Sequence, residues 1–166
     1  MVYTGHSLKE LAVKSVHPLD EKQISKDSVD LTISTRIKVV TPQNSVTLSN
    51  GDFNFDKELE GIKSSDNGWI EFVPGKLYLA YTREYLVLPS NVLGLINLRS
   101  YAARAGLLQA TALKISPGFR GYPILELTTS VPLKFQAGEP LIQLILYRTT
   151  DRTRYSGKYY NQQAGA

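Results

Sequence analysis

One carboxylate stands in an apolar stretch of the sequence. The segment SPGFRGYPILELTT covers residues 116–129, and its part from Tyr122 to Leu127 predicts a strand in which Glu126 falls between two leucines. A buried charge is costly unless another group pairs with it or a reaction uses it. Glu126 is therefore either half of a strand-end salt bridge with Arg104 or an acid–base catalyst, and these residues alone favour the salt bridge.

A second group of polar side chains precedes this strand in the sequence. Arg99, Ser100 and Arg104 lie in or beside SYAARAG, an alanine-rich stretch that predicts a short helix closed by Gly106. Ser100 and Arg104 are four residues apart and share one face of such a helix. A hydroxyl and two guanidinium groups suit phosphate oxygens, although arginines also often lie on surface helices.

The composition limits the other chemistries. The 166-residue chain has no cysteine, which removes disulfides and thiolate metal sites, and His6 and His17 have no metal-ligand spacing. Residues 99–166 hold nine Lys/Arg and three Asp/Glu, whereas residues 1–98 hold ten and twelve. This asymmetry indicates either an anionic partner or an ordinary solvated surface. The absence of a dense basic run favours a small phosphorylated ligand over nucleic acid.

Short strands separated by turn-forming residues dominate the remaining sequence. The predicted strands lie within residues 28–40, 45–49, 69–73, 76–88, 106–115, 122–135 and 140–149. Their regular spacing predicts one mainly β domain over residues 1–166, built as a sandwich, jelly roll or barrel. An early helix is predicted at residues 7–16, because Ser7 and Glu10 have the spacing of a capping box.

The two ends of the sequence carry weaker signals. MVYTGHSLKE is not followed by the apolar region of a signal peptide, and no stretch approaches the roughly 20 apolar residues of a membrane-spanning helix. We therefore expect a cytoplasmic protein without a membrane partner. The polar tail at residues 151–166 is typical of disorder, although Tyr155 near Lys158 and Gln162 would also suit a nucleotide lid.

Several motifs occur in an order that resembles a known protein family. LRSYAARAGL, ATALKISPGFRGYPILEL and GEPLIQL, with KDSVDLTIS upstream and KYYNQ in the tail, resemble the dCTP deaminases of the dUTPase-like superfamily. The resemblance runs from about Ser28 to Gln162. It implies a distorted jelly-roll β-barrel with one or two short helices, a homotrimer with active sites between subunits, and a nucleotide, dCTP or dUTP, bound as its Mg²⁺ complex under the C-terminal tail.

By position, the resemblance also implies a role for each residue of the site. Glu126 would be the acid–base carboxylate, and the reacting carbon and its water would be surrounded by Ser100, Arg104, Thr111 and Ala112. The phosphates would be held by Arg99, Ser100, Arg104, Lys158 and Gln162. Tyr155 would contact the nucleotide from the tail, and Ile124 lies on the strand whose backbone would read the pyrimidine. Two positions depart from the family pattern, since Ser116 replaces a usual aspartate and Tyr101 replaces a serine that often contacts phosphates.

The reaction that the resemblance implies is hydrolysis of dCTP to dUTP and ammonia in pyrimidine deoxynucleotide metabolism. Zinc deaminases hold their metal with His and Cys ligands, so in this cysteine-free chain Glu126 would activate the water instead. A dUTP pyrophosphatase, or a bifunctional enzyme that forms dUMP, is the first alternative, and Ser116 argues against it. A non-catalytic nucleotide-binding module is the second, and the presence of Glu126 argues against that.

Overall fold

The computed structural model describes residues 1–40, 59–62 and 67–156, with side chains for all but 59–62. The predicted strand at 45–49 and the tail residues Lys158 and Gln162 lie outside this part of the chain. The helices are α1 (Gly5–Ser15), the short 3-10 helix η1 (Glu21–Gln23) and α2 (Ser100–Arg104). The strands are β1 (Val16–His17), β2 (Val29–Leu31), β3 (Ile33–Val40), β4 (Leu59–Ile62), β5 (Trp69–Phe72), β6 (Leu77–Thr82), β7 (Tyr85–Val87), β8 (Val92–Leu98), β9 (Leu107–Gln109), β10 (Lys114–Ile115), β11 (Arg120–Gly121), β12 (Ile124–Thr129), β13 (Leu133–Gln136) and β14 (Ile142–Arg148).

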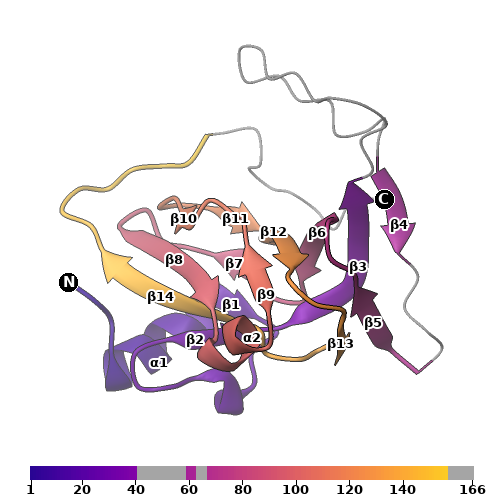
Figure 1. The fold of residues 1–166 in the computed structure, drawn as a ribbon. Coiled ribbons are helices and arrows are strands. Elements are labelled where there is room, and N and C mark those ends of the chain that lie inside the picture. The colour runs from indigo at the N-terminus through magenta and orange to yellow at the C-terminus, as the bar shows by residue number, and fades with distance from the viewer. Residues whose placement is uncertain (41–58, 63–66, 157–166) are drawn as a thin grey trace.

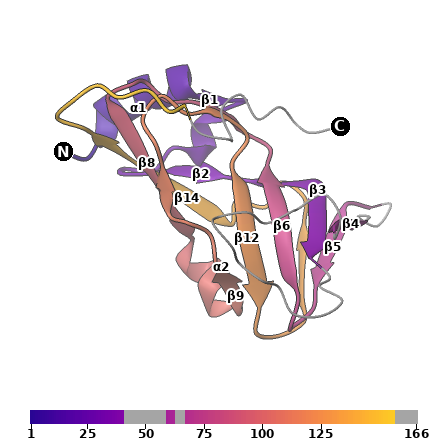
Figure 2. The ribbon, with the colours of Figure 1, turned by 90° about the horizontal axis from the view of Figure 1, so that it is seen from above.

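Antiparallel sheets form the framework of the described part of the molecule (Figure 1). The largest sheet has the strand order β4-β3-β6-β12-β9, and a second has the order β10-β8-β14-β2. Two smaller sheets, β1-β7-β11 and β13-β5, complete the pairing of the described strands. Seen from above, β12, β6 and β3 run side by side, while β8 and β14 form a separate group next to α1 (Figure 2).

One hydrophobic core joins the two large sheets. Leu125 and Leu127 of β12 belong to the same buried cluster as Ile142 and Leu144 of β14. Gly94 of β8 allows close packing there, because a Cβ at this position would lie 2.9 Å from Leu144 Cδ1. The expected mainly β architecture is confirmed as a distorted β fold, and in the part of the chain that the structure describes no sheet closes into a complete barrel.

Both predicted helices are present, but the start of the first one was predicted wrongly. α1 begins at Gly5, and the hydroxyl of Ser7 donates to the carbonyl of Thr4 instead of capping the helix. Glu10 lies 3.3 Å from Nε2 of His6 and so takes no part in a capping box. Leu8 and Ala12 are fully buried, as their spacing predicts. No helix in residues 1–40 or 67–156 is long and apolar enough to cross a membrane.

Candidate active site

Glu126 lies on the face of β12 that is turned away from the core. Along this strand Leu125, Leu127 and Thr129 are buried, whereas Ile124, Glu126 and Thr128 are half-buried. Successive side chains of a strand point to opposite faces, so a carboxylate between two leucines does not share their environment. The sequence-based reading of Glu126 as a charge on a buried strand face is therefore wrong, and the carboxylate can be reached by water.

Thr111 is fixed directly beside Glu126. The buried hydroxyl of Thr111 accepts a hydrogen bond from the backbone N–H of Glu126 at 2.7 Å and donates one to its carbonyl at 3.2 Å. The N–H of Ala110 donates to the same carbonyl at 2.8 Å. These bonds extend the pairing of β9 with β12 by two residues. They place Thr111 against Glu126, and the neighbouring Ala112 is exposed.

Arg99 is held by two partners at the start of α2. Its Nη1 lies 2.8 Å from Oδ2 of Asp30, and its guanidinium carbon lies 5.3 Å from the centre of the Tyr101 ring. Burial raises the pKa of Asp30 above its usual value, and the positive charge of Arg99 opposes that shift. Ser100 and Arg104, on the same short helix, are exposed. The predicted phosphate-binding side chains therefore reach the surface together.

The α2 residues and Glu126 form two separate groups within one chain. Among the described residues, no hydrogen bond or ion pair joins Glu126 to Ser100 or Arg104. The strand-end salt bridge between Glu126 and Arg104, the alternative to catalysis, is not formed in the single chain. The carboxylate and the cationic side chains are both available to a ligand or to another copy of the chain.

The beginning of the tail is packed against the body of the protein. The ring centre of Tyr155 lies 5.9 Å from that of Phe119, and its N–H donates to the carbonyl of Pro117 at 3.0 Å. Gly118, with a φ of +76°, lets the tail pass closely, since a Cβ there would lie 3.3 Å from Tyr155 N. The prediction of disorder for residues 151–166 is therefore wrong for the part of the tail up to Tyr155.

Ser116 directly precedes Pro117 and Gly118, which this part of the tail contacts. It is half-buried in the turn between β10 and β11, where its carbonyl accepts a hydrogen bond from the N–H of Phe119 at 3.2 Å. Ile124 begins β12 opposite Tyr81 of β6, so these two side chains share the face that carries Glu126. Arg36 lies over the Tyr81 ring, 4.3 Å from its centre, and adds a cation to this face.

The sequence analysis did not single out Arg36 or the carboxylates of Asp30 and Glu84, which make side-chain contacts in the structure. Strand alternation could have predicted the orientation of Asp30, because a polar residue between Val29 and Leu31 faces away from the side that these two residues share. No pattern in the sequence indicates the contacts of Glu84. It is 2% exposed and accepts hydrogen bonds from Gln23 and from the backbone and hydroxyl of Thr32, so it joins distant segments of the fold.

The described residues include no cluster of three His, Cys, Asp or Glu side chains able to hold a metal ion. Magnesium prefers several water and phosphate ligands to a cage made entirely of protein groups. A magnesium ion bound to a nucleoside triphosphate takes ligands from phosphate and water oxygens and does not require such a cluster.

Comparison with known proteins identifies the family. A sequence profile described as dCTP deaminase-like matches residues 2–149. The chain belongs to the dCTP deaminase-like family. A dCTP deaminase of Ignicoccus hospitalis is 32% identical over 135 residues, which cover 81% of this chain and 74% of that protein. A "dCTP deaminase, dUMP-forming" of a Sulfurihydrogenibium species is 31% identical, over 89% of this chain and 83% of its own length.

The fold of the family is seen again in a solved structure. The crystal structure of a 2'-deoxycytidine 5'-triphosphate deaminase from Agrobacterium tumefaciens superposes with a TM-score of 0.69 at 21% identity. The match covers 87% of this chain but 47% of that one, so the chain spans about half the length of the solved protein. At this identity the similarity concerns the fold.

Proposed function

We propose that this protein hydrolyses dCTP to dUTP and ammonia and so serves pyrimidine deoxynucleotide metabolism. Membership of the dCTP deaminase-like family supports this activity, as do the names of the Ignicoccus and Sulfurihydrogenibium relatives. The structural observation that carries the proposal is the position of Glu126. It lies half-buried on the outer face of β12, with Thr111 fixed against its backbone.

In the proposed mechanism Glu126 moves the protons of one hydration step. Its carboxylate takes a proton from a water molecule as the water oxygen bonds to C4 of the cytosine ring, and Glu126 passes this proton to N3. Glu126 then carries the proton of the new C4 hydroxyl to the amino group, the C4–N bond breaks, and ammonia leaves as the C4 carbonyl forms. General acid–base catalysis of this kind contributes roughly 10²–10⁴ in rate. Thr111 and Ala112 would line the position of the water.

The remaining groups of the site would come from a neighbouring subunit. Because Ser100 and Arg104 do not meet Glu126 within one chain, we propose a homotrimer in which α2 of one subunit faces β12 of the next. Arg99, Ser100 and Arg104 would then hold the phosphates of a magnesium–nucleotide complex. In this proposal residues 1–166 form one domain, and the tail from residue 151 closes over the nucleotide through Tyr155, Lys158 and Gln162.

A bifunctional enzyme that forms dUMP is the competing proposal, and the name of the Sulfurihydrogenibium relative favours it. Cleavage of the phosphate chain needs a base near the α-phosphate. Ser116 offers only a hydroxyl there, while the His6 ring contacts Glu10 and the His17 ring contacts the carbonyl of Lys14. We therefore propose dUTP as the end product.

A non-catalytic nucleotide-binding module would need no carboxylate at position 126.

Replacement of Glu126 by Gln tests the proposed role directly, since the change keeps the size of the side chain and removes the base. We expect deamination to fall at least about 10²-fold while dCTP still binds. Glu71→Gln is the matched control, because Glu71 is an exposed glutamate on β5 that pairs with Lys134 instead. Unchanged turnover in Glu126→Gln would exclude this mechanism.

A further inference from the structure

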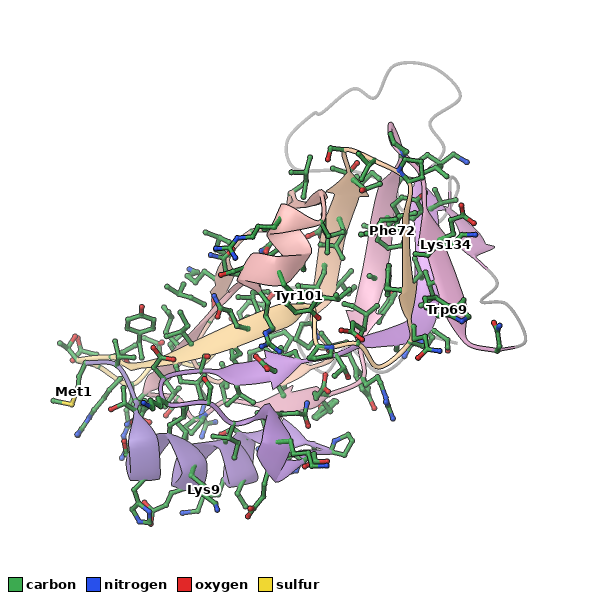
Figure 3. All side chains as sticks on the ribbon, turned by 60° about the horizontal axis from the view of Figure 1, so that its bottom comes forward. Met1, Lys9, Trp69, Phe72, Tyr101 and Lys134 are labelled. Atoms are coloured by element: carbon green, nitrogen blue, oxygen red, sulfur yellow. The ribbon has the colours of Figure 1, made fainter. Side chains whose placement is uncertain are left out.

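Tyr101 fastens α2 to a distant part of the chain. Its hydroxyl donates a hydrogen bond to Oε1 of Glu139 at 2.8 Å and approaches the carbonyl of Pro140 at 3.0 Å. Figure 3 shows Tyr101 on α2, on the side toward β14, the strand that Glu139 and Pro140 precede. The ring also stacks with the guanidinium of Arg99, which in turn pairs with Asp30 of β2. Three separate segments of the chain thus meet at this side chain.

Backbone hydrogen bonds fix the two ends of the short helix. The N–H of Arg99 donates to the carbonyl of Leu141 at 2.9 Å, and the carbonyl of Gly106 accepts from the N–H of Ser130 at 2.9 Å. α2 has five residues, and its N-cap residue, Arg99, makes no side-chain capping bond. Isolated helices of this length are unstable in water, so tertiary contacts must fix the helix. Ala102 is its buried residue, whereas Ser100 and Arg104 project to the surface. The contacts of Tyr101 add side-chain constraints on the exposed face of the helix to these backbone bonds.

We propose that Tyr101 is a positioning residue for the phosphate-contacting side chains of α2. Its hydroxyl ties the helix to Glu139, and its ring together with Asp30 holds Arg99 in place. This inference rests on the proposed phosphate contacts of Arg99, Ser100 and Arg104. A serine at position 101 could touch a phosphate itself but could not reach both Glu139 and Arg99, so in this chain the tyrosine acts through its neighbours.

The energetics of the cluster agree with a positioning role. Burial and the hydrogen bond to Glu139 both raise the pKa of the Tyr101 hydroxyl, so it stays a donor throughout the neutral range. Burial raises the pKa of Asp30 more strongly than Arg99 lowers it, so the fold gains little from this charge pair. A pair that adds little stability but fixes a guanidinium group is suited to organising a binding site.

Binding measurements on the full chain test the inference, with inorganic tripolyphosphate and dCTP as the probes. Tyr101→Phe removes only the hydroxyl, and we expect both probes to bind about tenfold more weakly. In steady-state assays KM for dCTP rises similarly, while kcat at saturation changes less than about twofold. Tyr147→Phe is the matched control, because the Tyr147 hydroxyl has no hydrogen-bond partner among the described residues.

A second variant separates positioning from general stability. Glu139→Leu removes the acceptor of the same bond, so Tyr101→Phe/Glu139→Leu should bind tripolyphosphate no more weakly than the weaker single variant. Additive losses, unchanged affinities, or no binding of either probe to the unmutated protein would overturn the inference. If tripolyphosphate binding depends on Tyr101 but dCTP is not deaminated, the proposed function fails and this inference stands.

Discussion

The chemistry available to Glu126 depends on strand geometry. Its neighbours Leu125 and Leu127 point into the core, while the carboxylate points to the opposite face and Thr111 bonds to the backbone of the same residue. The motif series predicts Glu126 as the acid–base residue, but it does not predict the surroundings of this side chain. Alternation in ILELTT shows which residues share a face, and only the pairing with β9 shows that Thr111 lies against Glu126.

Thr111 is predicted to support both the fold and the reaction. Thr111→Val keeps the shape but leaves the N–H of Glu126 without its 2.7 Å acceptor, which we expect to destabilise the protein by about 1–3 kcal/mol. Turnover should fall more than the folded fraction does, because the backbone that carries the carboxylate shifts. Thr111→Ser keeps the hydroxyl and is the control. Urea unfolding and initial rates provide the measurements, and equal behaviour of the Val and Ser variants would contradict the prediction.

Asp30 is predicted to make stability depend on pH in an unusual direction. Its pKa is raised in the folded protein, so the folded state holds this proton more tightly than the unfolded state. Its contribution to stability is therefore full below the unfolded value of 3.8 and declines as pH rises through the folded value. Asp30→Asn removes this decline, and its unfolding free energy relative to the unmutated protein should rise between about pH 4 and pH 7. Urea titrations at both pH values measure this, and a falling difference would disprove it.

At the scale of elements, local patterns predicted most strands and both helices. Alternating apolar residues predicted β12 and β14. Gly106, which has a φ of +96°, predicted the end of α2. β8 was overlooked because VLGLINL contains Gly94, which weakens a strand signal but is required for packing against Leu144. The cluster around Tyr101 joins residues 38 and more positions apart, which no local pattern reveals.

The tail is predicted to have two parts with different roles. Tyr155 packs on Phe119, so a chain ending at Asp151 loses this contact and should melt at a lower temperature. A chain ending at Ser156 keeps it, and should retain its melting temperature while losing most of its activity along with Lys158 and Gln162. Calorimetry and ammonia release distinguish the two truncations. Full activity in the chain that ends at Ser156 would show that residues 157–166 are not part of the site.

At the scale of the whole molecule, the proposal that sites are shared between subunits predicts that two inactive variants can restore each other. Light scattering should give about three times the 18.5 kDa chain mass. Glu126→Gln and Arg104→Ala, mixed in equal amounts, unfolded and refolded together, should regain about a quarter of the activity, because that share of sites combines two intact halves. The same variants mixed without unfolding are the control. An active monomer, or no recovery after refolding, would place the whole site in one chain.

The identity of the products tests the central claim most directly. The unmutated protein, incubated with dCTP and magnesium, should release one ammonia for each dUTP formed, with little dUMP or pyrophosphate, because Ser116 provides no base near the α-phosphate. Nucleotides are resolved by chromatography and ammonia is measured in the same samples, with dUTP as a second substrate. Equal amounts of ammonia and dUTP, and a stable dUTP control, are the predicted result. Intact dCTP without ammonia, or rapid conversion of dUTP to dUMP, would contradict it.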